Sequence, residues 1–206
     1  MLDLSTMIYR IPALLFALVV HEYAHALAAD SMGDPTPRYM GRLTLNPVMH
    51  VDVLGLLMLA LAGFGWAKPV PINSNNFHNR KEGIIKVSLA GPGANLFLCF
   101  VAALVGAILL RFNLMSQTVF NFLQWIMLYN VWFAFFNLIP IPPLDGSKLV
   151  MEFMPTKYLY QYAETVERYG FFILMALVFS GVVGAIINPL AQMYLGLVNF
   201  VLGVIF

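Results

Sequence analysis

The stretch MIYRIPALLFALVVHEYAHALAA, residues 7–29, decides the fold of this chain, because it is long and apolar enough to cross a lipid bilayer as a helix. Only Arg10, Pro12 and the cluster HEYAH interrupt it. A signal peptide would begin with basic residues and end at a small-residue cleavage site, whereas Asp3 precedes this segment and no clear cleavage site follows it. We therefore expect it to be retained as the first membrane helix.

The composition also indicates a membrane protein. Of the 206 residues, 61% are hydrophobic and only 10% are charged, whereas a soluble domain carries about 25% charged residues. The length suits a single integral-membrane domain over residues 1–206, with a core over about 7–148 and C-terminal helices over about 168–206. The formal net charge of +1, carried by single or paired basic residues, argues against nucleic acid as a partner.

The other apolar runs predict an all-α, polytopic fold of about five membrane helices. After the first segment they cover residues 84–110, 119–139, 171–187 and 190–206, and Asn188-Pro189 separates the last two. Residues 53–66 form a run of only about 14 residues with three glycines, so we expect a re-entrant segment there.

A different pattern precedes that short run. The stretch RYMGRLTLN, residues 38–46, partly alternates between polar and apolar side chains. Such alternation is typical of a strand or hairpin. We therefore expect a short membrane-associated β-hairpin after the first helix.

Basic residues predict the orientation, because Lys and Arg of short loops are held on the cytoplasmic side. They gather after the first helix and again after the sequence LDG, whereas only Arg10 and Arg111 remain for the opposite side. We therefore expect a multi-pass protein of the cell membrane whose first helix runs inward. The basic residues of the two cytoplasmic regions are Arg38, Arg42, Lys68, Arg80, Lys81 and Lys86, then Lys148, Lys157 and Arg168.

The cluster HEYAH carries the candidate chemistry. In a helix, its spacing places His21 and His25 on one face, one turn apart, where they can hold a single metal ion. Glu22 beside them can take a proton from an attacking water and pass it to a leaving amine, which is peptide hydrolysis. The alternative is a pair of neutral core histidines and a buried glutamate, all hydrogen-bonded to neighbouring helices.

Catalytic zinc usually takes three protein ligands, so the two histidines need a partner. The candidates are His50, His78 and the carboxylates near helix ends, among which Asp145 has the most unusual surroundings. Prolines 140, 142 and 143 exclude a regular helix before it, and Gly146 relaxes the backbone after it. A solvated or hydrogen-bonded loop histidine is the alternative for His50 and His78, and a capping turn aspartate is the alternative for Asp145.

Topology favours Asp145. If the first helix runs inward, the run 84–110 leads outward and the run 119–139 returns inward, which delivers Asp145 to the side of the histidine pair. This order of crossings holds only if residues 53–66 do not form a single membrane-spanning segment, which would reverse the direction of the later runs. The metal would then lie near the cytoplasmic face, on the order of 7–14 Å inside the helix end marked by Asp30.

These residues resemble the site-2 protease family, the intramembrane zinc metalloproteases of peptidase family M50. HEYAH fits the family's HExxH, and NLIPIPPLDG, residues 137–146, fits its N-x-x-P-x-P-x-L-D-G pattern without a departure. AGPGAN, residues 90–95, looks like the family's A-G-P-x-x-N element, and GWAKPVPIN, residues 65–73, looks like compact bacterial members. The resemblance covers most of the chain from Leu14 to about Lys148.

The resemblance implies one catalytic Zn²⁺ held by His21, His25 and Asp145, with Glu22 as the general base. The lipid bilayer and a single-spanning membrane protein substrate would be its partners, and the cut would fall near the cytoplasmic side, in regulated intramembrane proteolysis. We expect neither a PDZ insertion nor a CBS domain, so the membrane segments or a regulatory membrane partner would supply any substrate gate.

The resemblance further implies that Asn137 and Asn95 hold the substrate strand or the developing oxyanion. Helix packing is the alternative for Asn95. For the whole chain, the alternative is a metal-binding transport or regulatory membrane protein, in which the same ionisable cluster would mark an ion pathway. Glu22 favours the enzyme, because transport has no need for that base.

Overall fold

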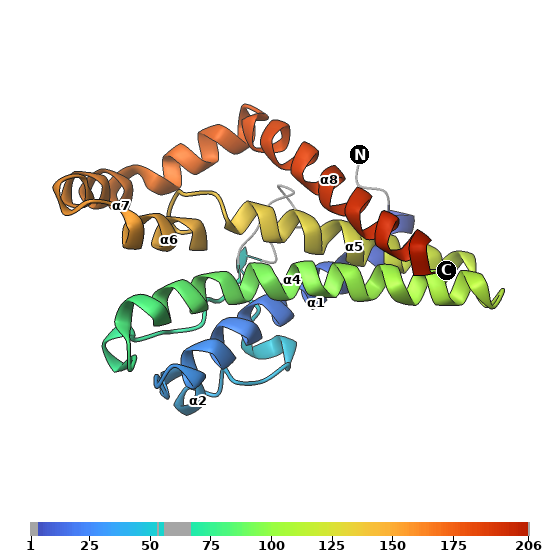
Figure 1. Ribbon diagram of the computed structural model, residues 1–206, viewed down its shortest axis with the longest axis horizontal. Coiled ribbons are helices and arrows are strands. Elements are labelled where there is room, and N and C mark those ends of the chain that lie inside the picture. Colours follow the sequence, from blue (N-terminus) through green and yellow to red (C-terminus); the bar gives the residue numbers. More distant parts are fainter. Residues whose placement is uncertain (1–3, 53, 56–66, 206) are drawn as a thin grey trace.

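The computed structural model describes residues 4–52, 54–55 and 67–205 (Figure 1). Within these ranges the regular structure is helical, and the only β pairing is an isolated antiparallel bridge between Val51 and Ala67. The prediction of an all-α fold is confirmed there. The elements are α1 (Leu4–Ser31), α2 (Thr36–Tyr39), the 3₁₀ turns η1 (Pro47–Met49) and η2 (Ser74–Asn76), α4 (Arg80–Arg111), α5 (Gln117–Asn137), α6 (Asp145–Phe153), α7 (Thr156–Phe179) and α8 (Val182–Ile205).

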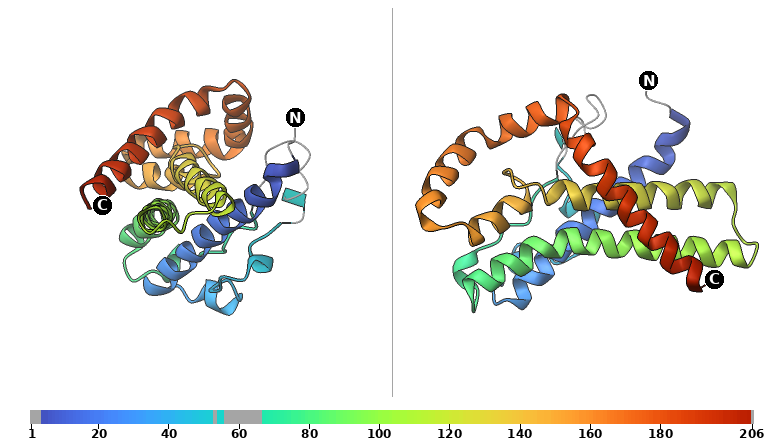
Figure 2. Two further views of the ribbon diagram at one scale, coloured as in Figure 1. Left: turned by 90° about the vertical axis from the view of Figure 1, so that its right-hand side faces the viewer. Right: turned by 45° about the horizontal axis from the view of Figure 1, so that its top comes forward.

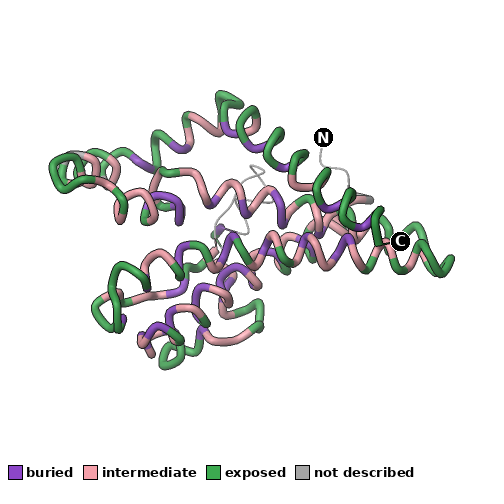
Figure 3. Tube along the Cα trace, in the orientation of Figure 1, coloured by how far each residue is buried: buried purple, intermediate pink, exposed green. Residues whose placement is uncertain are grey.

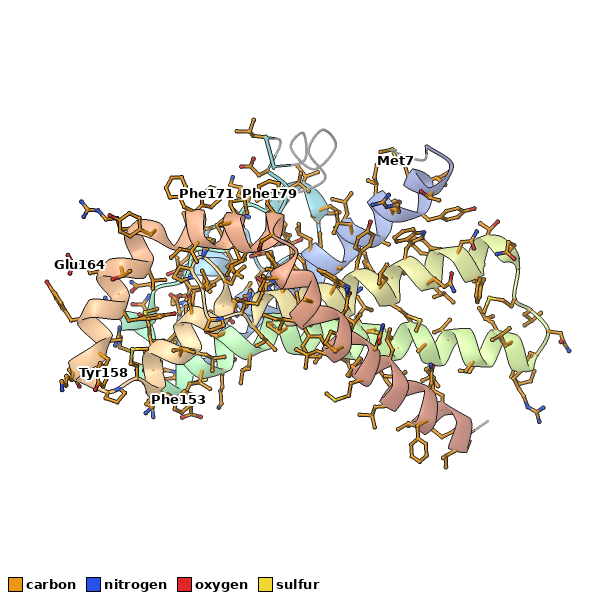
Figure 4. The ribbon with its side chains drawn as sticks, turned by 90° about the horizontal axis from the view of Figure 1, so that it is seen from above. Met7, Phe153, Tyr158, Glu164, Phe171 and Phe179 are labelled. Carbon is orange, nitrogen blue, oxygen red and sulfur yellow. The ribbon has the colours of Figure 1, made fainter. Side chains whose placement is uncertain are left out.

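Four of the described helices are long and apolar enough to cross a membrane: α1 over Thr6–Ser31, α4, α5 and α8. The chain is therefore a multi-pass membrane protein, but the expected number of about five helices is wrong for the described residues. In α7 the apolar part covers only Arg168–Phe179. Its first half is polar and rich in tyrosine, and Tyr158 and Glu164 lie at one end of the molecule, far from Met7 (Figure 4).

The expected boundary at Asn188-Pro189 is also wrong. Pro189 lies inside α8, and the chain turns earlier, after Ser180. Gly181 makes this turn with a φ of +79°, a conformation that side chains disfavour. Membrane helices tolerate an internal proline because neighbouring groups satisfy the freed backbone carbonyl, so the glycine ends the helix and the proline does not.

The β-hairpin expected over residues 38–46 does not form. The short helix α2 instead begins at Thr36, and Pro37 lies in its first turn, where a proline is tolerated. Gly41 then turns the chain with a φ of +66°, and the Asn46 side chain accepts from the Val48 N–H to cap η1. Of the expected re-entrant segment, residues 53 and 56–66 lie outside the described residues.

The core forms where α1, α4 and α5 pack together, with α8 lying across α4 and α5 (Figure 2). Small side chains allow this close approach, as in other membrane bundles. Ala13 of α1 packs with Ala102 of α4 and Ile126 of α5 in one cluster. The buried residues lie along these contacts, whereas α7 and α8 are exposed over much of their length (Figure 3).

Helix α7 arches away from the bundle and is anchored to the loop between α5 and α6 (Figure 1). The Tyr162 hydroxyl donates to the Pro140 carbonyl at 2.6 Å. Gly170 lies against Pro142, since a Cβ at position 170 would be 3.0 Å from the Pro142 oxygen. This proline loop leads directly to Asp145 and therefore positions the candidate site.

Candidate metal centre

His21 and His25 lie one turn apart on the buried face of α1. Their side chains are almost fully buried, and the two Nε2 atoms are 3.0 Å apart. The rings are nearly perpendicular, with centroids 4.5 Å apart, and the Phe133 ring of α5 packs edge-on against His21 at 5.0 Å. The helical spacing predicted from HEYAH therefore brings both imidazoles to one point.

Asp145 reaches that point from a distant part of the sequence. Helix α5 ends at Asn137, and the proline-rich turn returns the chain to the bundle, where Asp145 begins α6. Its Oδ2 lies 3.2 Å from His21 Nε2 and 2.9 Å from His25 Nε2. The structure thus brings together the three predicted ligands, although Asp145 lies more than a hundred positions from the two histidines.

The three atoms fit a zinc ion. Zinc bonds of about 2.0–2.1 Å in a tetrahedral arrangement separate two ligand atoms by about 3.3 Å, close to the 2.9–3.2 Å observed here. His25 Nδ1 lies 2.7 Å from the Val87 carbonyl, which can only accept, so the proton is on Nδ1 and the Nε2 lone pair faces the cluster. A cation would satisfy this convergence of lone pairs and carboxylate.

The electrostatics favour an ionised Asp145. Burial opposes the charged form, but the positive charge of Lys148 favours it. Lys148 Nζ lies 3.2 Å from Oδ1, the oxygen that does not face the histidines. The carboxylate can therefore serve as a ligand through one oxygen while the other is paired.

Glu22 is buried beside the histidine pair, and a backbone group holds it. Its Oε2 accepts from the Val70 N–H at 3.0 Å. Pro69 and Pro71 flank Val70 and have no N–H, so Val70 supplies the one backbone donor between Lys68 and Ile72. The Lys68 N–H bonds to the His50 carbonyl at 2.9 Å, which fixes one end of this segment.

Asn95 and Asn137, the two expected substrate-binding residues, occupy different surroundings. Asn95 is fully buried behind His21, with its Oδ1 2.7 Å from His21 Nδ1. Asn137 donates from Nδ2 to the Phe133 carbonyl of its own helix at 2.9 Å. Their predicted contact with substrate stays a prediction.

The other two histidines are not part of the cluster. His50 Nε2 lies 2.7 Å from the Thr44 carbonyl, and the His78 ring packs against Gly33. Among the residues that the structure describes, the metal-compatible group consists of His21, His25 and Asp145.

Three contributors to the site were not predicted. The Val70 N–H holds Glu22, Gly91 lies against both imidazoles, and Asn130 accepts a hydrogen bond from Asn95. A backbone donor leaves no sequence signal, but the alternation of prolines around Val70 was visible. Asn130, an amide in the apolar run 119–139, was also a visible signal, because polar groups at membrane depth need partners.

Comparison with known proteins finds relatives that are named as zinc metalloproteases. A model of Peptidase family M50 matches residues 111–178. YwhC of Bacillus subtilis, which carries a zinc metalloprotease name, is 36% identical over 180 residues, covering 84% of this chain and 81% of YwhC. Rip2 of Mycolicibacterium smegmatis, similarly named, is 33% identical over 64% of this chain and 52% of its own length.

A more distant relative is the zinc metalloprotease MJ0392 of Methanocaldococcus jannaschii, which is 24% identical over 71% of this chain and 34% of its own length. No solved structure matches the chain with significance. The identity to YwhC extends over most of both chains. The chain therefore belongs to peptidase family M50, the site-2 protease family.

Proposed function

We propose that this chain is an intramembrane zinc endopeptidase that hydrolyses peptide bonds of single-spanning membrane proteins near the cytoplasmic side of the cell membrane. The convergence of His21 Nε2, His25 Nε2 and Asp145 Oδ2 beside the buried Glu22 is the observation that carries this proposal. The packing of α1, α4, α5 and α8 around one core supports a single protease domain over residues 1–206.

Each residue of the site has a role in the proposal. His21, His25 and Asp145 hold one zinc ion, and the bound ion supplies Lewis acidity toward a peptide carbonyl and toward water. Glu22 takes the proton of the attacking water and gives it to the leaving amine. The Val70 N–H fixes one oxygen of Glu22, which supports a base held in one orientation.

The depth of the site supports cleavage inside the membrane. His25 precedes the end of α1 at Ser31 by six residues, which is about 9 Å at 1.5 Å per residue. Charge bias supports the cytoplasmic side, because basic residues follow both α1 and the LDG sequence. The substrate would therefore be a membrane segment that unwinds near its cytoplasmic end, as regulated intramembrane proteolysis requires.

We assign Asn137 to the substrate strand. It ends α5 immediately before the loop that delivers Asp145, and the residue whose carbonyl it contacts, Phe133, packs against His21. Its place at the end of α5, next to the proline loop, supports this contact. A regulatory membrane partner remains part of the proposal as a source of substrate gating.

The test is cleavage of a single-spanning membrane peptide by purified protein in proteoliposomes with zinc. Glu22→Gln is expected to lower kcat by about 10²–10⁴-fold, the usual contribution of a positioned base. Glu82→Gln, which disturbs only an exposed ion pair with Lys86, is the matched control and should cleave normally. No cleavage by wild type, or cleavage that survives Glu22→Gln, would contradict the proposal, and zinc flux that survives Glu22→Gln would favour a transporter.

A further inference from the structure

We propose that two buried asparagines, Asn95 of α4 and Asn130 of α5, form a hydrogen-bond relay that holds His21 in the tautomer that a metal ion requires. Both are positioning residues that act through His21. Their effect on zinc affinity rests on the proposed metal centre, whereas the hydrogen bonds themselves are present in the structure without a metal ion.

The relay runs through three helices without a gap. Asn130 Nδ2 donates to the Ile126 carbonyl at 2.8 Å, and Asn130 Oδ1 accepts from Asn95 Nδ2 at 2.7 Å. Asn95 Nδ2 also donates to the Ala17 carbonyl of α1 at 2.9 Å. Asn95 Oδ1 then lies 2.7 Å from His21 Nδ1, and both asparagines have 0% exposure.

Two backbone carbonyls fix the direction of every bond in the relay. The Ile126 carbonyl can only accept, so Asn130 must turn its NH₂ toward it and its oxygen toward Asn95. That oxygen and the Ala17 carbonyl both require donors, so Asn95 must present its NH₂ to them and its oxygen to His21. His21 Nδ1 therefore carries the proton, and the Nε2 lone pair faces Asp145 and His25.

The two histidines reach the same tautomer by different means. His25 Nδ1 donates to a backbone carbonyl, Val87 O, which a side-chain substitution does not remove. His21 depends on the orientation of an amide, and an isolated amide could turn either oxygen or nitrogen toward the ring. Asn130 and Ala17 remove this freedom, so His21 is the ligand whose competence depends on side chains in α4 and α5.

The consequence is measurable as zinc affinity of the purified full-length chain, determined by competition with a chromophoric chelator. Asn95→Leu removes the acceptor of the Nδ1 proton and should weaken zinc binding by about 10–100-fold, as loss of such partners usually does. Asn95→Asp should bind more tightly than Asn95→Leu, because a carboxyl group in either protonation state still accepts that proton.

Asn130→Leu tests the more remote member, and we expect a smaller loss of affinity than for Asn95→Leu. The matched control is Asn121→Leu on the same helix, because Asn121 pairs only with Gln117 near the start of α5 in the bonds that the structure describes. Its zinc affinity should equal that of wild type. Thermal unfolding of the zinc-free variants, measured in parallel, separates a loss of fold from a loss of affinity.

Wild-type zinc affinity in Asn95→Leu would overturn the relay, and so would equal losses in Asn95→Leu and Asn95→Asp. If the leucine variants do not fold, ¹⁵N NMR spectra of the zinc-free wild type test the relay instead, because they report the tautomer of His21. The His21 ring signals are identified as those that disappear in His21→Gln. A proton on Nε2 would overturn the relay. If the zinc affinities follow this ranking but the wild type cleaves no substrate, the proposed protease function is contradicted and the relay is still supported.

Discussion

Gly91 of α4 lies directly against His21 of α1, so that a Cβ atom at position 91 would be 2.6 Å from His21 Cε1. The same Cβ would be 2.6 Å from His25 Nε2. Real Cβ atoms essentially never come within 3.0 Å of another group, so the two helices can meet at the metal cluster only where α4 has no side chain. Gly91, the first of the two glycines in AGPGAN, therefore forms one wall of the site.

Gly91→Ala should displace both imidazoles and lower zinc binding. We expect a loss of stability of about 1–3 kcal/mol, as for other overpacked sites, together with loss of cleavage. Gly93→Ala is the matched control in the same helix, because a Cβ there meets nothing within 4 Å. Zinc content and thermal unfolding of both variants check this, and normal zinc binding by Gly91→Ala would show that the packing described here is wrong.

Val70→Pro should lower activity while preserving zinc binding. The substitution removes the N–H that holds Glu22 Oε2, and the extended backbone between two prolines can accept a third. We expect kcat to fall about ten-fold, a part of what a positioned base contributes. Val70→Ala keeps the N–H and controls for the lost side chain. Equal kcat values in the proline and alanine variants would exclude a role for this hydrogen bond.

Gly146→Ala should disrupt the turn that delivers Asp145. A Cβ at this position would collide with backbone atoms of Leu138 and Ile139, which cannot move aside as a flexible side chain can. We expect a loss of about 3 kcal/mol, near the upper end for overpacking, together with loss of zinc. Gly196→Ala in α8 meets nothing within 4 Å and should behave as wild type in thermal unfolding. An unchanged melting temperature for Gly146→Ala would contradict the close approach.

Asp34 lies in the loop after α1, and Asp34→Asn should make the free energy of unfolding less dependent on pH. Burial opposes ionisation of Asp34, yet hydrogen bonds from Thr36, Asn73 and Asn76 hold its pKa below the usual range. A lowered folded pKa adds stability above the unfolded pKa of about 3.9, and this stability is lost as the pH falls through the folded pKa.

We expect Asp34→Asn to cost about 1.5–3 kcal/mol at pH 7, as loss of charged hydrogen bonds does. The difference from wild type should shrink as the pH falls below 4. Thermal unfolding in detergent between pH 3 and 7 measures it. A constant difference across this range would show that the Asp34 charge does not stabilise the loop.

The metal cluster could be predicted because it depends on features that the sequence carries. The HEYAH spacing fixes the relation of His21 to His25 once the segment is helical, and the prolines before Asp145 predict an irregular turn. The order of the apolar runs then predicts that this turn lies on the same side as the histidine pair. The relation of Asn95 to His21 could not be predicted in this way, because it depends on how α4 rotates against α1.

Two predictions, the β-hairpin and the helix boundary at Asn188-Pro189, were wrong because the same local pattern occurs in more than one kind of structure. Alternating polarity over residues 38–46 is typical of a strand, but here burial does not alternate: residues 38–41 are exposed, and Arg42 is buried although it is charged. Asn188-Pro189 reads as a break in a soluble helix, whereas a membrane helix continues through it. Gly181 was the true boundary, but the sequence alone does not show which glycine adopts a positive φ.

The most direct test of the proposed centre is the zinc content of purified wild type against Asp145→Ala, with Glu152→Ala in the same helix as the control. Asp145 is the proposed ligand that lies more than a hundred residues from the histidine pair, so its loss tests the fold and the site together. We predict about one zinc per chain in wild type and in Glu152→Ala, and zinc loss in Asp145→Ala. Wild-type zinc content in Asp145→Ala would contradict the account.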